Sequence, residues 1–67
     1  MNKYKEMAMR AVNIGDRLRI EDSEEYNLIG KEGIVQAIDD MGQIHGTWGV
    51  AISFEYGDRF TVLQRNE

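Results

Sequence analysis

A glycine-rich segment between Gly30 and Trp48 places the strongest constraint on how this chain folds. Together with Gly15-Asp16 upstream, it reads GDRLRI, then a polar loop, then LIGKEGIVQAIDDMGQIHGTW. Apolar and polar residues alternate in most of these runs, which is typical of strands with one buried face. Glycines separate the runs, because glycine adopts the backbone angles that tight turns require. The segment therefore predicts short antiparallel strands in a small, strongly bent sheet.

The same alternation continues to the end of the chain and predicts five short strands. Turns recur every eight to twelve residues or so, which is typical of all-β barrels and sandwiches. A barrel is the economical solution at this length, since closing the sheet removes its exposed edges. We therefore expect an all-β fold, a small five-stranded SH3-like barrel. The predicted strands cover residues 15–20, 34–38, 43–48, 50–56 and 59–63. The second of them breaks its alternation, which indicates a bulge or a strand buried partly on both faces.

One short α-helix is predicted ahead of the barrel, over residues 3–11. Its sequence KYKEMAMRA contains good helix formers, and Asn2 is a suitable N-cap. So short a helix is unstable alone, and we expect its apolar stripe to pack on the barrel. The chain is predicted to be a single domain over residues 1–67, with the barrel at 15–63. The stripe consists of Tyr4, Met7, Ala8 and Ala11.

The strand patterns also predict which side chains form the core. We expect one contiguous apolar cluster, closed at one end by the helix stripe. Trp48 shares its face with Ile44, which favours a core position, although an exposed platform for a ligand is the alternative. The predicted core consists of Leu18, Ile20, Leu28, Val35, Ile38, Ile44, Trp48, Ile52, Phe54, Phe60 and Val62.

Composition excludes several kinds of site. The chain has no cysteine and one histidine, His45, so thiolate zinc sites and multi-histidine sites within one chain are excluded. Asp39 and Asp40 are the acids closest to His45, but a calcium loop needs a longer run of oxygen ligands. A turn with local Asx hydrogen bonds is the favoured interpretation there. We expect no metal and no cofactor.

The same inventory predicts a cytoplasmic protein that is not an enzyme. No apolar run approaches the roughly 18 residues of a membrane span, and the first ten residues lack an apolar signal core. His45 has no serine or cysteine partner in a recognisable motif. A barrel filled by its own side chains also leaves no pocket for a substrate.

Charge is distributed unevenly along the chain. The formal net charge is −4, yet residues 1–20 carry five bases against two acids, whereas residues 21–67 carry three bases against ten acids. The overall field should repel a phosphate backbone, although a local patch around Arg17 and Arg19 would still attract one.

Two resemblances follow from these motifs. The run GDRLRI…LIGKEGIVQAIDD is similar to the opening of the KOW-type SH3-like modules of ribosomal and transcription-associated proteins. Nearly the whole chain resembles a family of small, uncharacterised bacterial domains that is common in mobile elements of Gram-positive hosts. That resemblance implies the fold but no activity, and this chain has a shorter turn after the tryptophan. The shared elements are Gly15/Leu18/Ile20, Ile29-Gly30/Gly33/Val35, Asp39-Asp40-Met41-Gly42-Gln43-Ile44, Trp48 and Tyr56-Gly57-Asp58.

The predicted function is that of a protein-interaction accessory module with a basic protein partner. Its surface combines the acidic first loop with nearby tyrosines, because long loops often carry function and aromatic rings supply contact area. The rival is a KOW-like nucleic-acid-binding module that uses Arg17, Arg19 and Lys31. A dimer that covers an apolar edge is a third possibility, so the predicted state is a monomer or weak homodimer. The predicted partner-binding residues are Glu21, Asp22, Glu24, Glu25, Tyr26, Tyr56 and Asp58.

Overall fold

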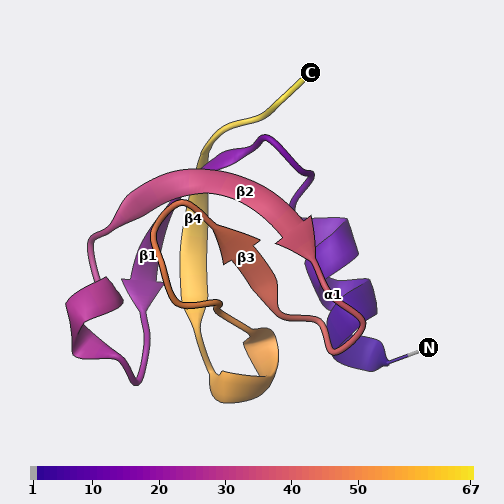
Figure 1. The fold of residues 1–67 in the computed structure, drawn as a ribbon, viewed down its shortest axis with the longest axis horizontal. Coiled ribbons are helices and arrows are strands. Elements are labelled where there is room, and N and C mark those ends of the chain that lie inside the picture. Colours follow the sequence, from indigo (N-terminus) through magenta and orange to yellow (C-terminus); the bar gives the residue numbers. More distant parts are fainter. Residues whose placement is uncertain (1) are drawn as a thin grey trace.

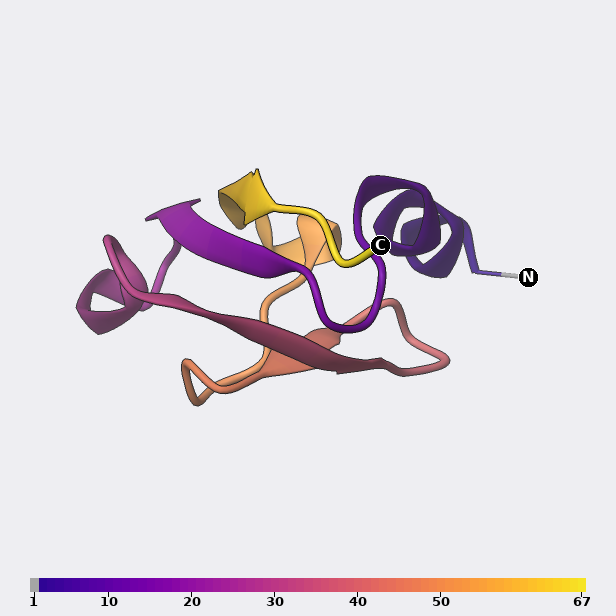
Figure 2. The same ribbon diagram turned by 90° about the horizontal axis from the view of Figure 1, so that it is seen from above.

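The computed structural model describes residues 2–67 and contains one antiparallel sheet, one α-helix and two 3₁₀ helices, η1 and η2. The strand order is β3-β2-β1-β4. Figure 1 shows β2 arching across the molecule, and Figure 2 shows that this curvature folds the sheet over, with β1 and β4 in one layer and β2 and β3 in the other. The elements are α1 (Lys3–Ala11), β1 (Arg17–Asp22), η1 (Tyr26–Leu28), β2 (Glu32–Ile38), β3 (Ile44–Gly46), η2 (Phe54–Tyr56) and β4 (Arg59–Gln64).

The predicted five-stranded SH3-like barrel is wrong. Within residues 2–67 the sheet has four strands and stays open, with β3 and β4 at its two edges. Residues 50–56, predicted as the fourth of five strands, form a single bridge between Ile52 and Ile44 and then turn into η2. With α1 packed beside the open sheet, the chain is a small mixed α/β domain and not an all-β one.

Ser53 explains why the predicted strand over residues 50–56 does not form. Its backbone N–H donates to Asp58 Oδ2 at 2.9 Å, so it is not free to bond a neighbouring strand. Its hydroxyl oxygen accepts the Glu55 N–H at 3.1 Å and caps η2, which Gly57 ends at a φ of 83°. Val50, at the start of the segment, is 61% exposed. The alternation of apolar residues here therefore does not mark one buried face.

Helix α1 covers the same residues as the helix predicted from the sequence. Asn2 Oδ1 accepts the Tyr4 N–H at 2.8 Å and caps it, as predicted. Ala8 of the predicted apolar stripe is buried as expected, but Met7 is 43% exposed, and Val12, which lies outside the predicted stripe, is buried. The small alanine lets the helix lie close to the sheet. No helix described in residues 2–67 combines the length and the apolar character needed to cross a membrane.

The core is one contiguous cluster beneath the bent sheet. It contains most of the predicted residues, and Trp48 is 4% exposed, so its core position is confirmed. Phe54 lies outside the cluster and packs on Phe60, with ring centroids 5.4 Å apart. Ala8, predicted as part of the helix stripe that closes the core, and Val12, which was not predicted, both belong to the cluster. The buried members are Ala8, Val12, Leu18, Ile20, Leu28, Val35, Ile44, Trp48 and Ile52, and Ala11, Ile38, Phe60 and Val62 pack against them.

Two glycines make room for the Trp48 ring. A Cβ atom at Gly33 would lie 2.9 Å from Trp48 Cε3, and one at Gly46 would overlap the same ring. The indole Nε1 donates to the Val50 carbonyl oxygen at 2.9 Å, so the polar edge of the ring is also satisfied. The glycines are therefore required because the indole crosses β2 and β3 at close range.

Asp16 fastens the C-terminal segment to the junction of α1 and β1. Its side chain is fully buried; Oδ2 accepts the Asn13 N–H at 2.8 Å and Arg65 Nη1 at 3.1 Å, and Oδ1 accepts the Asn66 N–H at 2.7 Å. Burial pushes the pKa of Asp16 upward, but the hydrogen bonds from Asn66, Asn13 and Arg65 outweigh it and lower the pKa overall. We call this group of four residues the Asp16 clamp. It orders a segment that the sequence predicts to be only a polar tail.

Candidate functional site

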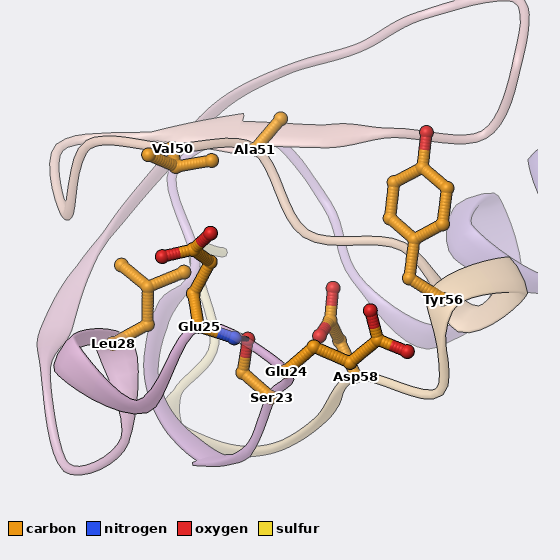
Figure 3. Close-up of a pocket in the computed structure, with 8 residues that line it drawn as sticks. All are labelled: Ser23, Glu24, Glu25, Leu28, Val50, Ala51, Tyr56 and Asp58. Atoms are coloured by element: carbon orange, nitrogen blue, oxygen red, sulfur yellow. Dashed lines mark hydrogen bonds between the residues drawn. The ribbon is translucent and has the colours of Figure 1, made fainter.

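A pocket of about 300 Å³ opens between the β1–η1 loop and the two segments that flank η2. The sequence analysis predicts no such pocket, because it assumes a closed barrel. In Figure 3, Leu28 and Tyr56 stand at opposite ends, with Val50 and Ala51 along one side. We call this site the acidic pocket. It is lined by Ser23, Glu24, Glu25, Leu28, Val50, Ala51, Tyr56 and Asp58.

The β1–η1 loop presents two carboxylates to the pocket. Ser23 is buried, and its hydroxyl oxygen accepts the Glu25 N–H at 3.1 Å. The Leu28 N–H donates to the Glu25 carbonyl oxygen at 2.9 Å, which joins the loop to η1. Glu24 and Glu25 are exposed, and neither carboxylate forms an ion pair within residues 2–67. Short local bonds therefore fix the loop backbone and leave both charges available.

Asp58 supplies a third carboxylate, and this one is buried. The residue is 4% exposed, and its Oδ2 accepts the Ser53 N–H at 2.9 Å. Its Oδ1 receives no hydrogen bond from the described part of the chain, in which every fully enclosed side-chain nitrogen or oxygen has a partner. Its Oδ1 is therefore not fully enclosed, and Asp58 is one of the residues that line the acidic pocket.

Tyr56 forms one end of the acidic pocket and is held in place from the β3 side. Its hydroxyl oxygen accepts Gln43 Nε2 at 2.6 Å, although the side chains of both residues reach the surface. The backbone turn of η2 and the left-handed Gly57 that follows it fix where the ring begins. The ring is thus anchored at both its base and its tip.

The acidic pocket combines negative charge with apolar walls. Three of its eight lining residues are acids and none is a base, while Leu28, Val50 and Ala51 are apolar. The adjacent Arg59 turns to its own neighbours, since it donates to the Asp58 carbonyl oxygen at 2.8 Å and lies over the Phe54 ring. Such a site suits a cation carried on an apolar stem.

The structure brings together the predicted residues Glu24, Glu25, Tyr56 and Asp58, all of which line the acidic pocket. Of these, the buried Asp58 also closes its own turn through Ser53. The apolar half of the site is not predicted from the sequence, because the alternation places Val50 and Ala51 in a strand and Leu28 only in the core. The exposed side chain of Val50 is visible only once the strand fails to form.

The other three predicted residues lie outside the acidic pocket. Tyr26 begins η1 and is 83% exposed. Asp22 ends β1 opposite Arg59 of β4. Glu21 accepts both Arg19 Nε at 3.2 Å and Thr61 Oγ1 at 2.6 Å, and these bonds, led by that from Arg19, lower its pKa. Glu21 therefore holds β1 to β4 on the surface of the sheet.

The predicted basic patch is largely neutralised by neighbouring acids. Arg17 Nη2 pairs with Glu32 Oε1 at 3.2 Å, and Arg19 Nη2 pairs with Glu21 Oε2 at 3.1 Å. The bonds to Glu21 raise the pKa of Arg19. Lys31 is exposed beyond these pairs. A phosphate would thus compete with a carboxylate for each arginine.

Asp39 and His45 form a turn of the kind the sequence predicts. Asp39 Oδ1 accepts the N–H groups of Met41 and Gln43 at 3.0 and 2.9 Å, and its Oδ2 lies 2.8 Å from His45 Nε2. The bond to His45 is the main reason that the pKa of Asp39 is lowered. Within residues 2–67 no three side chains are grouped as metal ligands would be.

Comparisons with protein-family models, curated proteins and solved structures gave no match. The resemblances described from the sequence therefore stay predictions, and the functional argument rests on the geometry of the acidic pocket.

Proposed function

We propose that this chain is a non-enzymatic cytoplasmic interaction module that takes a basic side chain of a partner protein into the acidic pocket. The observation that carries this proposal is the position of Asp58. This largely buried residue lines a surface pocket, one of its carboxylate oxygens receives no hydrogen bond, and no base within residues 2–67 pairs with it.

The two exposed acids and the apolar walls serve different stages of binding. Glu24 and Glu25 extend the negative field beyond the rim, which speeds the approach of a basic partner. Leu28, Val50 and Tyr56 supply contact area once the side chain is inside, which slows its release. The partner is therefore expected to be selected by charge and retained by packing.

An interaction role is favoured over catalysis by what lines the acidic pocket. Its residues include no histidine, lysine or cysteine, and its one aliphatic hydroxyl, on Ser23, accepts a backbone N–H from its own loop. Among the described residues that hydroxyl forms no hydrogen bond with a carboxylate or an imidazole, whereas nucleophilic catalysis requires an adjacent base.

Affinity capture from the native host, read by mass spectrometry, tests the proposed function. The bait is the wild-type chain beside the double variant Glu24→Gln/Glu25→Gln. A matched control, Glu6→Gln/Glu55→Gln, removes two exposed acids that do not line the acidic pocket. We expect a basic protein to be retained by the wild type and the control and lost from the pocket variant. Equal retention by all three would contradict the proposal.

Nucleic-acid binding is the competing function, and the ion pairs of Arg17 and Arg19 weigh against it. Titration with single- and double-stranded oligonucleotides at low salt should give no binding. Salt-sensitive binding that weakens in Arg17→Ala and Arg19→Ala would replace the proposed function, because each lost phosphate contact reduces the salt dependence by about one unit.

A further inference from the structure

We infer that the acidic pocket is specific for the side chain of arginine over that of lysine. The inference rests on the proposed function and names the chemical group that the site takes. Three features of the pocket carry it: the spread of its carboxylates, the apolar surface between them, and the fixed orientation of Asp58.

The carboxylates approach the acidic pocket from different segments. Glu24 and Glu25 belong to the β1–η1 loop, whereas Asp58 precedes β4. Figure 3 shows the Glu25 carboxylate rising beside Leu28, while Asp58 lies nearer the Tyr56 end. A guanidinium presents five N–H donors in a planar fork and bonds carboxylates on two sides at once. The compact ammonium of lysine is a point charge that satisfies one of them well at a time.

The apolar walls add to this preference. A cation that reaches Asp58 passes Leu28, Val50 and Ala51 and leaves part of its water behind. Guanidinium is more weakly hydrated than ammonium, so its desolvation costs less. The volume of about 300 Å³ is at the lower end for ligand sites and matches one extended side chain better than a larger ligand.

Asp58 is oriented before any ligand arrives. The 2.9 Å bond from the Ser53 N–H fixes Oδ2, and the burial of the residue limits its rotation. Its Oδ1 is left as an acceptor for one strong, charge-assisted hydrogen bond. A site that is already ordered loses little entropy on binding.

Titration of the labelled protein with short peptides, followed by amide chemical shifts, tests the inference. The probes are acetyl-Gly-Arg-Gly-amide, its lysine counterpart, and its citrulline counterpart, which keeps the shape of arginine without the charge. We expect the arginine peptide to bind at least about threefold more tightly than the lysine peptide, with shifts at Glu25, Val50 and Asp58. The citrulline peptide should cause no such shifts.

Two variants test which carboxylates are responsible for the binding of arginine. Asp58→Asn keeps an oxygen for the Ser53 N–H but removes the charge, and it should weaken arginine binding roughly tenfold, the loss expected for one charged hydrogen bond. Glu25→Gln, at an exposed position, tests the same point without touching a buried group. Glu55→Gln is the matched control and should leave binding unchanged.

Each outcome of the titration has a defined meaning. Equal affinity for the arginine and lysine peptides would overturn the arginine preference and leave the proposed function standing. Absence of shifts with either charged peptide up to about 10 mM, a very weak affinity, would overturn both. Binding of citrulline as tight as that of arginine would also overturn both, because charge would then not be recognised.

Discussion

Two Gly-Asp pairs launch the two strands of the β1–β4 pair, yet their aspartates serve opposite ends of the molecule. Gly15 and Gly57 both have positive φ angles, 95° and 83°, and both aspartates are buried. Both carboxylate oxygens of Asp16 accept hydrogen bonds from other parts of the chain. Asp58 accepts one N–H of its own turn through Oδ2, its Oδ1 receives no hydrogen bond from the described residues, and the residue lines the acidic pocket.

The difference teaches how to separate a structural carboxylate from a binding one when both are buried. Burial alone does not distinguish them, and neither does the local sequence. What distinguishes them is whether the charge has a cation inside the fold. Arg65 lies 3.1 Å from Asp16, whereas within residues 2–67 no base pairs with Asp58.

Replacing each of the two aspartates by alanine should give the largest difference in the free energy of unfolding. Asp16→Ala leaves the part-buried N–H groups of Asn13 and Asn66 without this acceptor and also removes the partner of Arg65, so it should lower the free energy of unfolding by roughly 3 kcal/mol. Asp58→Ala leaves only the Ser53 N–H without its acceptor and should lower the free energy of unfolding by about 1 kcal/mol. Urea unfolding of both variants measures the difference. A larger loss for Asp58→Ala would show that the structural role is assigned to the wrong residue.

Low pH should weaken the Asp16 clamp. The pKa of Asp16 is lowered from its ordinary value of 3.8, so the unfolded chain takes up a proton more readily than the folded one. The contribution of Asp16 to stability is then fully present well above pH 3.8 and is lost as the pH falls through the lower, folded pKa. Asp39→Asn should remove less of this acid dependence than Asp16→Asn, because Asp39 is more exposed. Unfolding curves at several pH values measure this, and an unchanged slope in Asp16→Asn would contradict it.

Arg65→Ala should have a moderate effect on stability. Arg65 donates to both Asp16 Oδ2 and the Ala11 carbonyl oxygen, but its side chain is half exposed and partly screened by water. A loss of about 1 kcal/mol in the free energy of unfolding is expected. Arg10→Ala, at an exposed position on α1, is the control and should stay within about 0.5 kcal/mol of the wild type. Equal effects would mean that the clamp does not depend on its cation.

Removing the two charges at the rim of the acidic pocket should have the smallest effect on stability. Glu24→Gln/Glu25→Gln should change the free energy of unfolding by less than about 0.5 kcal/mol, since neither acid has a partner to lose. The same variant should lose binding of the partner. Thermal unfolding compared with peptide titration checks both halves of this statement, and a destabilised double variant would place these acids in the structure and not in recognition.

Local patterns in the sequence predict much of the fold. The range of α1 follows from its helix formers and Asn2, and the register shift between Val35 and Ala37 confirms the bulge predicted in that strand. The turn before β3 has Gly42 at a φ of 84°, as its position after two aspartates suggests. In each case the signal and its cause lie within a few residues.

The prediction of a closed barrel is wrong because, in the predicted fourth strand, a side chain takes the hydrogen bond that a neighbouring strand would accept. The bond from the Ser53 N–H to Asp58 ends the predicted fourth strand, and nothing in the alternation of residues 50–56 reveals it. The clamp is equally hidden, because Asp16 and Asn66 are 50 residues apart. For the site, an acidic loop before an aromatic residue indicated Glu24 and Glu25, but the apolar wall comes from a segment whose path the sequence did not predict.

The pairing of β1 with β4 has a consequence for how this protein is made. Leu18 lies opposite Val62, so the second edge of β1 stays uncovered until β4, the last of the four described strands, is available. A ribosome that has released only the residues up to β3 holds a chain whose first strand still exposes that edge and whose Asp16 has no cation. Such a long-range pair forms slowly, because the chain between the two strands must close into a loop first. Until then the growing chain depends on its charged residues, rather than on its structure, to stay apart from its neighbours.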